Sequence, residues 1–171
     1  MPGARRISLL RHAKAGARDT PDHGRELTRE GRAQCAQVAE HLLEHGRVPQ
    51  LVLCSTATRT RQTWELVAAG LGESSPVRFL DVLYSADVSD AVDVLTQVPG
   101  DVTEVLVVGH EPTVSETAHH LAGAGSEPGA LALVRIGVPT ASLSLLHTDA
   151  PWSDLARGSA VLTAVLTSPH R

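Results

Sequence analysis

Four side chains that could bind and attack a phosphoryl group follow three short apolar runs of the sequence. Arg11 and His12 follow the first run, Arg59 lies just beyond the second, and His110 follows the third. Guanidinium groups pair their N–H donors with phosphate oxygens two at a time, and a neutral imidazole can attack phosphorus to form a covalent intermediate. A second imidazole could stabilise the charge on the transferring group. Together these residue types indicate phosphoryl transfer in which arginines do the work of a metal ion.

The elements that must position these residues alternate along the chain. The three apolar runs, at residues 7–10, 51–54 and 102–109, are typical of strands buried on both faces of a parallel sheet. Because ligands bind beyond the carboxyl ends of the strands in open α/β sheets, we expect the four side chains to converge. Apolar residues at helical spacing occur in residues 28–43, 64–71, 87–98 and 113–121.

The last forty residues follow a different pattern. Apolar runs at residues 131–136, 141–148 and 160–167 are separated by short turns, so we expect three strands with no helix between them. Such strands would pair antiparallel at an edge of the sheet. The prediction is therefore one α/β domain over residues 1–171, a three-layer α/β/α fold with a mostly parallel central sheet and antiparallel strands at its C-terminal edge.

The composition argues against several functions. Aromatic residues make up 2% of the 171 residues, too few for the stacking platforms that bind single-stranded nucleic acid. The net charge of −4 is also a poor match for a polyanion, although residues 1–32 hold eight basic and four acidic side chains. No apolar run approaches the ~18 residues of a membrane helix, and the N-terminus does not resemble a signal peptide. We therefore expect a cytoplasmic protein, with Cys35 and Cys54 as buried free thiols.

Three segments resemble the signature blocks of the histidine phosphatase superfamily, whose fold is phosphoglycerate mutase-like. They are RHAKA at residues 11–15, STATRTRQT at residues 55–63 and VVGHEP at residues 107–112. The short length, the segment DHGRELTREG at residues 22–31 and LYSAD at residues 83–87 resemble the SixA-type phosphohistidine phosphatase branch of that superfamily.

The resemblance implies a role for each of the four residues. His12 would be the phosphorylated nucleophile, Arg11 and Arg59 would clamp the phosphate, and His110 would be the second histidine. No metal or other cofactor is implied.

Five further side chains near these blocks are candidates with an open role. Ser55 either donates to the phosphate or ends its strand and caps the next helix, and Lys14 either adds positive field or is solvated. Arg25 and His23 lie on the loop after the first strand and could contact the leaving group. Arg61 is expected on the surface, because it lies two residues after Arg59 and would point about 200° away from Arg59 around a helix.

The leaving group separates two kinds of phosphatase. Larger members of the superfamily keep a carboxylic acid that protonates an alkoxide, and here Val82 aligns with that position. Asp81, Asp87 and Glu111 are nearby, and Glu111, directly after His110, is the possible general acid that we retain. General acid catalysis contributes about 10²–10⁴ in rate, whereas imidazole, whose pKa is about 6.5, can leave without that help. The absence of a firm match to the acid therefore favours P–N cleavage.

We therefore expect a metal-independent phosphatase that removes phosphate from phosphohistidine in proteins through a phosphohistidine intermediate. Two alternatives stay open, a general phosphomonoesterase acting on small phosphorylated compounds and a non-catalytic phosphate-binding module. Adjacent His119 and His120 point about 100° apart on a helix, so we expect a surface pair and not a metal site. Nucleic acid and membrane partners are not expected, and a monomer is favoured.

Overall fold

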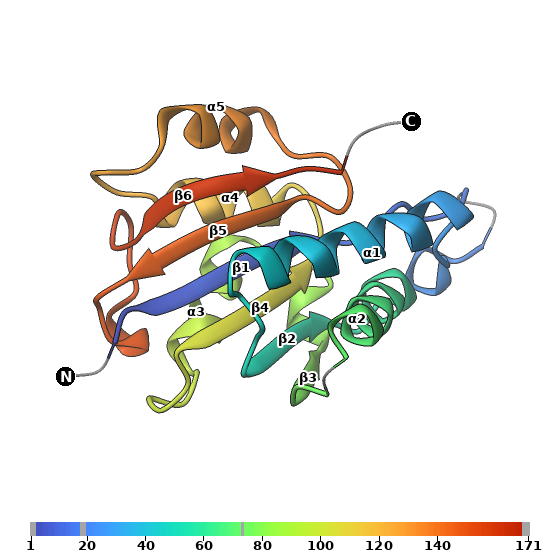
Figure 1. Cartoon of the computed structure of the whole chain (residues 1–171), viewed down its shortest axis with the longest axis horizontal. Coiled ribbons are helices and arrows are strands. Elements are labelled where there is room, and N and C mark those ends of the chain that lie inside the picture. The colour runs from blue at the N-terminus through green and yellow to red at the C-terminus, as the bar shows by residue number, and fades with distance from the viewer. Residues whose placement is uncertain (1–2, 18–19, 73, 169–171) are drawn as a thin grey trace.

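Six strands form one sheet in the computed structural model, which describes residues 3–17, 20–72 and 74–168 (Figure 1). Their order across the sheet is β3-β2-β4-β1-β5-β6. The pairs β2–β4 and β1–β4 are parallel, and β1–β5 and β5–β6 are antiparallel, as predicted. The pair β2–β3 is also parallel. The strands are β1 (Arg5–Arg11), β2 (Leu51–Ser55), β3 (Val77–Leu80), β4 (Glu104–Gly109), β5 (Leu143–Thr148) and β6 (Val161–Leu166).

Helices cover both faces of the sheet, which confirms the predicted three layers. Neighbouring strand residues point to opposite faces, so Leu9 packs in one apolar core and Leu10 in the other. The core around Leu10 includes buried residues of α1 (Arg29–Glu44) and α2 (Thr58–Leu71). The core around Leu9 includes residues of α3 (Val88–Thr96), α4 (Thr113–Leu121) and α5 (Pro128–Ile136).

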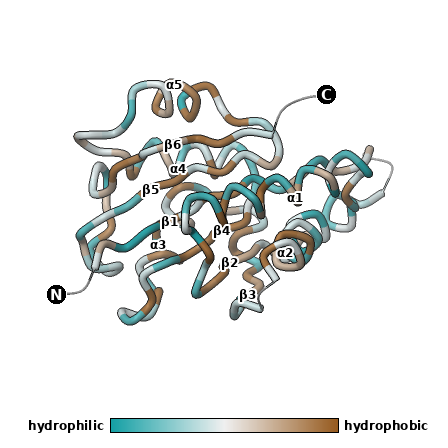
Figure 2. Tube along the Cα trace, viewed as in Figure 1, coloured by the Kyte–Doolittle hydropathy of each residue, from teal (hydrophilic) through white to brown (hydrophobic). Residues whose placement is uncertain are grey.

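Hydropathy follows this layering. Figure 2 shows the most hydrophobic segments in the central strands, whereas α1 presents mainly polar residues. Every residue of β2 and of β4 is buried, as expected for strands covered by helices on both faces. Within the described residues, no helix is long and apolar enough to cross a membrane.

The ends of the predicted helices have clear local causes. Thr28 is the N-cap of α1, since its side-chain oxygen accepts from the Gly31 N–H. Gly72 ends α2 in a left-handed conformation with φ 67°, which glycine adopts at little cost. Asp87 and Asp90 form a reciprocal capping box at the start of α3.

One predicted strand is wrong, because residues 131–136 belong to helix α5. The Glu127 side chain accepts from the Gly129 and Ala130 N–H groups at the helix N-terminus, and Pro128 stands at a position where its missing N–H costs nothing. Only Ala130 and Val134 are buried, at i and i+4, while Ile136 is 86% exposed. A helix that exposes apolar residues shows no polar face in its sequence, so the run resembled a strand.

Strand β3 was not predicted from the sequence. This strand spans four residues at the edge of the sheet, and Phe79 in its middle is exposed. Such a short run gives too few residues for a period of two to be recognised.

Candidate active site

The carboxyl ends of β1, β2 and β4 bring the four predicted residues to one edge of the sheet. His12 continues the hydrogen bonding of β1, because its backbone N–H donates to the Gly109 carbonyl (3.0 Å). The imidazole rings of His12 and His110 consequently lie side by side, with centroids 5.4 Å apart. Both rings line a cleft of about 270 Å³, together with Arg11 and Arg59.

His12 is held as a neutral imidazole with one nitrogen free. Its Nδ1 lies 2.8 Å from the Ala13 carbonyl oxygen, and a carbonyl can only accept, so Nδ1 carries the proton and Nε2 keeps its lone pair. Burial lowers the pKa of His12 to about 4, opposed by the bond to Ala13 and reinforced by the charges of Arg59 and Arg11. At neutral pH the ring can therefore act as a nucleophile.

Helix α2 fixes the loop that carries His12. The Ala13 N–H donates to Thr63 Oγ1 (3.0 Å), and this hydroxyl donates in turn to the Arg59 carbonyl (2.7 Å). At the far end of the same loop, just before α1, the Leu27 N–H donates to Gln62 Oε1 (2.8 Å). The nucleophile loop and the helix turn that carries Arg59 are thus joined by direct hydrogen bonds.

The N-terminus of α1 packs against the same loop at Gly31. The Lys14 carbonyl accepts from the Thr28 N–H (2.9 Å), and a Cβ added to Gly31 would lie 2.1 Å from the Lys14 carbonyl oxygen. Because this neighbour is backbone, the loop or the helix would have to move.

We expect Gly31→Ala to lower the free energy of unfolding by about 1–3 kcal/mol, the usual cost of overpacking, and to lower kcat because the His12 loop shifts. Denaturant unfolding and steady-state assays measure the two effects. Gly100→Ala is the matched control, since no atom lies within 4 Å of its added Cβ. A Gly31→Ala variant as stable and active as the wild type would contradict this tight packing.

Three buried nitrogen atoms at the cleft have no hydrogen-bond partner among the described residues. Arg11 donates through Nη1 to the Val138 carbonyl (2.7 Å), and Arg59 donates through Nη1 to the Asp22 carbonyl (2.8 Å). The Nε atoms of both arginines and Nδ1 of His110 are left without partners. A buried polar group without a partner costs about 1–3 kcal/mol, and more when charged. All three atoms belong to residues that line the cleft, so an anion bound there is a candidate partner for them.

Ser55 lies behind His110. Its hydroxyl accepts weakly from the Ala57 N–H (3.3 Å) and lies 2.8 Å from His110 Nε2. If the hydroxyl proton is donated to Nε2, the proton of the neutral ring is on Nδ1, the unpartnered atom. Burial lowers the pKa of His110 to about 3, with further lowering by the charges of Arg59 and His12. Ser55 thus orients His110, and Ala57, not Ser55, is the N-cap of α2.

Lys14 and Arg25 also line the cleft. Lys14 Nζ forms an exposed ion pair with Glu30 (2.6 Å). Arg25 donates from Nε to the Gly16 carbonyl (3.0 Å) and pairs through Nη1 with Asp22 (3.2 Å). Both cations therefore add positive charge at the rim while bound to neighbouring groups.

The Glu111 carboxylate is engaged in structural hydrogen bonds. Its oxygens accept from the Ser115 N–H (2.8 Å) and hydroxyl (2.6 Å) in α4 and from the Val138 N–H (3.2 Å). Arg11 donates to the carbonyl of the same Val138. The backbone of this one residue, in the loop after α5, therefore orients both Glu111 and Arg11. This geometry suits a carboxylate that positions the loop better than one that delivers a proton.

The remaining candidates lie outside the cleft. Arg61 packs over the Phe79 ring at 4.1 Å and donates to the Thr56 carbonyl (2.8 Å), at the surface as expected. His119 and His120 line a separate groove between α4 and α5. Among the residues that the structure describes, no group of three or more His, Cys, Asp or Glu side chains could hold a metal ion.

Two residues of the cleft region were not predicted, Asp22 and Tyr84. Asp22 Oδ2 accepts from the Tyr84 hydroxyl (2.5 Å) and from Arg59 Nη2 (3.2 Å), and Oδ1 accepts from Arg25. The Tyr84 hydrogen bond, followed by those from the two arginines, holds the pKa of Asp22 well below its usual range. Both residues lie in segments that resemble the SixA-type branch, but 62 positions separate them and nothing in the sequence pairs them.

Comparison with known proteins gives a consistent result. The family model of the histidine phosphatase superfamily (branch 1) matches residues 7–90. An uncharacterised protein of Mycobacterium tuberculosis is 34% identical over 155 residues, which cover 90% of this chain and 96% of that protein. A structure of the "putative phosphohistidine phosphatase SixA" of Nakamurella multipartita is similar with a TM-score of 0.84 and 36% identity, over 97% of both chains. The protein of the same description from Agrobacterium tumefaciens has a TM-score of 0.80 and 27% identity, over 98% of this chain and 100% of that one.

Proposed function

Since the chain belongs to the histidine phosphatase superfamily, we propose that it is a metal-independent phosphatase that removes phosphate from phosphohistidine in proteins through an intermediate on His12. The observation that carries the proposal is the pairing of a free nucleophilic nitrogen with unpartnered donors at one cleft. His12 Nε2 has its lone pair, and the Arg11 and Arg59 Nε–H groups have no acceptor among the described residues.

The first step transfers the phosphoryl group to His12. Its oxygens bind Arg11, Arg59 and His110 Nδ1–H, which offset the negative charge. His12 Nε2 attacks phosphorus in line with the leaving group and forms a new N–P bond, while the bond to the leaving atom breaks and its electron pair stays with that atom. Nδ1–H, hydrogen-bonded to the Ala13 carbonyl, stabilises the positive charge that the phosphorylated ring acquires.

The second step releases phosphate. A water molecule attacks phosphorus, the N–P bond breaks, and its electron pair returns to His12 Nε2. Both protons of the water stay on the released phosphate, which leaves as dihydrogen phosphate, so that His12 regains its neutral form. The low pKa of His12, about 4, favours this release because the free ring is preferred in the neutral state.

The leaving group favours phosphohistidine over phosphate esters. An ester releases an alkoxide that needs a proton, and neither carboxyl group of the cleft suits that role. Glu111 already accepts three hydrogen bonds from Ser115 and Val138, and the pKa of Asp22 is held well below its usual range. Imidazole, with a pKa near 6.5, leaves without a strong acid. A general phosphomonoesterase with small phosphorylated substrates is the second candidate, and it requires Glu111 to leave these partners.

A side-by-side assay tests the proposal. We expect kcat/KM on a phosphohistidine peptide to exceed that on a phosphoserine peptide by about 10² or more, the contribution of the missing acid, with no loss of activity in a metal chelator. Sugar phosphates and p-nitrophenyl phosphate complete the comparison. Faster turnover of phosphoserine or sugar phosphates would favour the phosphomonoesterase, and binding of phosphohistidine without turnover would favour a phosphate-binding module. Strong inhibition by the chelator would contradict the metal-free mechanism.

A further inference from the structure

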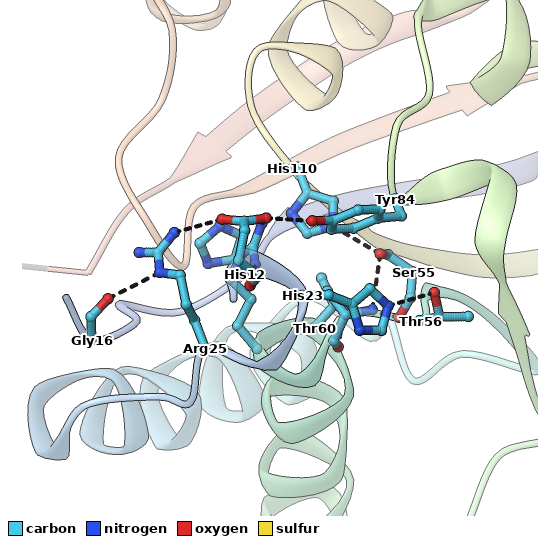
Figure 3. Close-up of polar contacts among 12 residues, drawn as sticks. His12, Gly16, His23, Arg25, Ser55, Thr56, Thr60, Tyr84 and His110 are labelled. Atoms are coloured by element: carbon cyan, nitrogen blue, oxygen red, sulfur yellow. Dashed lines mark hydrogen bonds and ion pairs between the residues drawn. The ribbon is translucent and has the colours of Figure 1, made fainter. Parts of the chain in front are cut away.

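An acidic and aromatic cluster stands at the mouth of the cleft without a role in the steps above. Tyr84 donates its hydroxyl proton to Asp22 Oδ2 (2.5 Å). The Tyr84 ring contacts the His110 ring edge-on, with centroids 5.7 Å apart, and the His23 ring, with centroids 4.8 Å apart. Figure 3 shows Tyr84 next to His110, with His23 held near Thr56 on the adjacent loop. His23 Nε2 lies 3.1 Å from the Thr56 hydroxyl.

A carboxylate is unexpected in a cleft that binds only phosphate. The side chain of Asp22 is 49% exposed, whereas that of its partner Arg59 is 8% exposed. The charged and titratable groups that face Asp22 are Arg25, Arg59, Tyr84 and His110. Tyr84 and the two arginines keep the carboxylate ionised. Asp22 holds Arg59 and Arg25, but its negative charge at the entrance also repels a phosphate dianion. This charge favours substrate binding only if the other part of the substrate is positive.

We infer that Asp22 and Tyr84 form the leaving-group subsite and that this subsite takes a protonated imidazole ring. The inference rests on the proposed function, and it names the residues that recognise the phosphohistidine side chain. The Arg59 guanidinium already lies over the Tyr84 ring, 6.0 Å from its centroid, and a protonated imidazole would be attracted to the ring in the same way. Asp22 Oδ1 accepts one hydrogen bond, from Arg25, and a carboxylate oxygen has two lone pairs, so it can accept a second from a ring N–H.

The bonds and charges of the reaction balance in this arrangement. In phosphohistidine one ring nitrogen is bonded to phosphorus and the other can hold a proton. When it does, His12 Nε2 forms the new N–P bond, the substrate P–N bond breaks, and its electron pair neutralises the departing ring, which keeps its proton on the other nitrogen. A nearby carboxylate favours the protonated, reactive form of the substrate. An alcohol leaving group has no such nitrogen and gains nothing from Asp22.

Asp22 also holds Arg59, so the test must separate leaving-group recognition from the positioning of that arginine. We expect Asp22→Asn to lower kcat/KM for a phosphohistidine peptide about tenfold more than for p-nitrophenyl phosphate, the effect of about one pKa unit on the substrate ring. The pH above which phosphohistidine turnover declines should also fall in this variant. Asp93→Asn, at an exposed position of α3, is the matched control.

A second pair of variants examines the aromatic ring. Tyr84→Phe removes the hydrogen bond to Asp22 and keeps the ring, whereas Tyr84→Leu removes both, so we expect a larger loss of phosphohistidine selectivity in Tyr84→Leu. Thermal unfolding of each variant shows whether it is folded. If Asp22→Asn does not fold, the comparison of Tyr84→Phe with Tyr84→Leu tests the inference in its place.

Equal losses on both substrates in Asp22→Asn, with weaker inhibition by inorganic phosphate, would overturn the inference, because Asp22 would then act only through Arg59. If both Tyr84 variants kept the wild-type preference for the phosphohistidine peptide over p-nitrophenyl phosphate, the Tyr84 ring would have no role in recognising the leaving group. A wild-type protein that fails to hydrolyse phosphohistidine, in contrast, would contradict the proposed function itself.

Discussion

Replacement of His12 by alanine is expected to lower turnover by at least about 10⁴-fold, as loss of a nucleophile does in covalent catalysis. The expectation follows from the tautomer that the structure imposes, since the Ala13 carbonyl holds the proton on Nδ1 and leaves Nε2 to attack. His110 is a poor replacement nucleophile, because its Nε2 is hydrogen-bonded to the buried Ser55 hydroxyl. Covalent labelling should disappear together with turnover.

Steady-state assays and acid-quenched labelling with a radioactive phosphoryl donor measure the two effects. His119→Ala, at an exposed position of α4, is the matched control and should keep full activity and labelling. His110→Ala should turn over slowly but still become labelled, because it retains the nucleophile. Labelling that persists in His12→Ala and disappears in His110→Ala would reverse the roles that we give to the two histidines.

The two histidines are equivalent in the sequence but not in their surroundings. Each follows a strand, His12 is buried and His110 is half-buried, and burial is the main cause that lowers the pKa of each. The difference is the partner, since His12 faces a carbonyl that must accept and His110 faces a hydroxyl that can donate. When the hydroxyl donates to His110, one ring presents a lone pair and the other an N–H, which is the combination that attack on phosphorus and stabilisation of its oxygens require.

The convergence of these residues was predictable because it depends on topology. Continuous apolar runs indicated buried parallel strands, and the carboxyl ends of such strands meet at one edge of the sheet. Residues directly after those runs, such as His12 and His110, are therefore near one another even though about a hundred residues separate them. Arg59 was among the polar residues just beyond the second run, and the resemblance to the superfamily gave it the role of a phosphate clamp; the structure places it inside helix α2.

Other features depend on tertiary contacts that leave no local pattern. Ser55 and Glu111 were seen as polar residues near the site, but only the fold shows that one orients His110 and that the other binds the backbone of Val138. The partnership of Asp22 with Tyr84 joins the loop after β1 to the turn before α3. Helix α5 was mistaken for a strand because its exposed apolar residues conceal the helical period.

Arg59 shows why arginine is needed at the clamp. Its two Nη atoms donate to the backbone and side chain of Asp22, and its Nε has no partner among the described residues. In the proposed mechanism this Nε–H binds the substrate. A guanidinium can bind both sides at once because its five N–H donors form a rigid fork, whereas an ammonium is a compact charge on a flexible stem. The preference of this chain for arginine, 14 of its 15 basic residues, is thus functional at this position whatever its general cause.

We therefore expect Arg59→Lys to lower kcat/KM by about 10²–10³-fold although the charge is kept, a loss similar to that of one essential transition-state donor. Inhibition by inorganic phosphate should weaken in parallel, because the same N–H group binds the ground-state anion. Arg61→Lys is the matched control on the same helix, since Arg61 packs on Phe79 outside the cleft, and its activity should equal that of the wild type. If Arg59→Lys, shown to be folded by its thermal unfolding, retains wild-type activity, a positive charge alone is sufficient at this position and the two-sided role of the guanidinium is wrong.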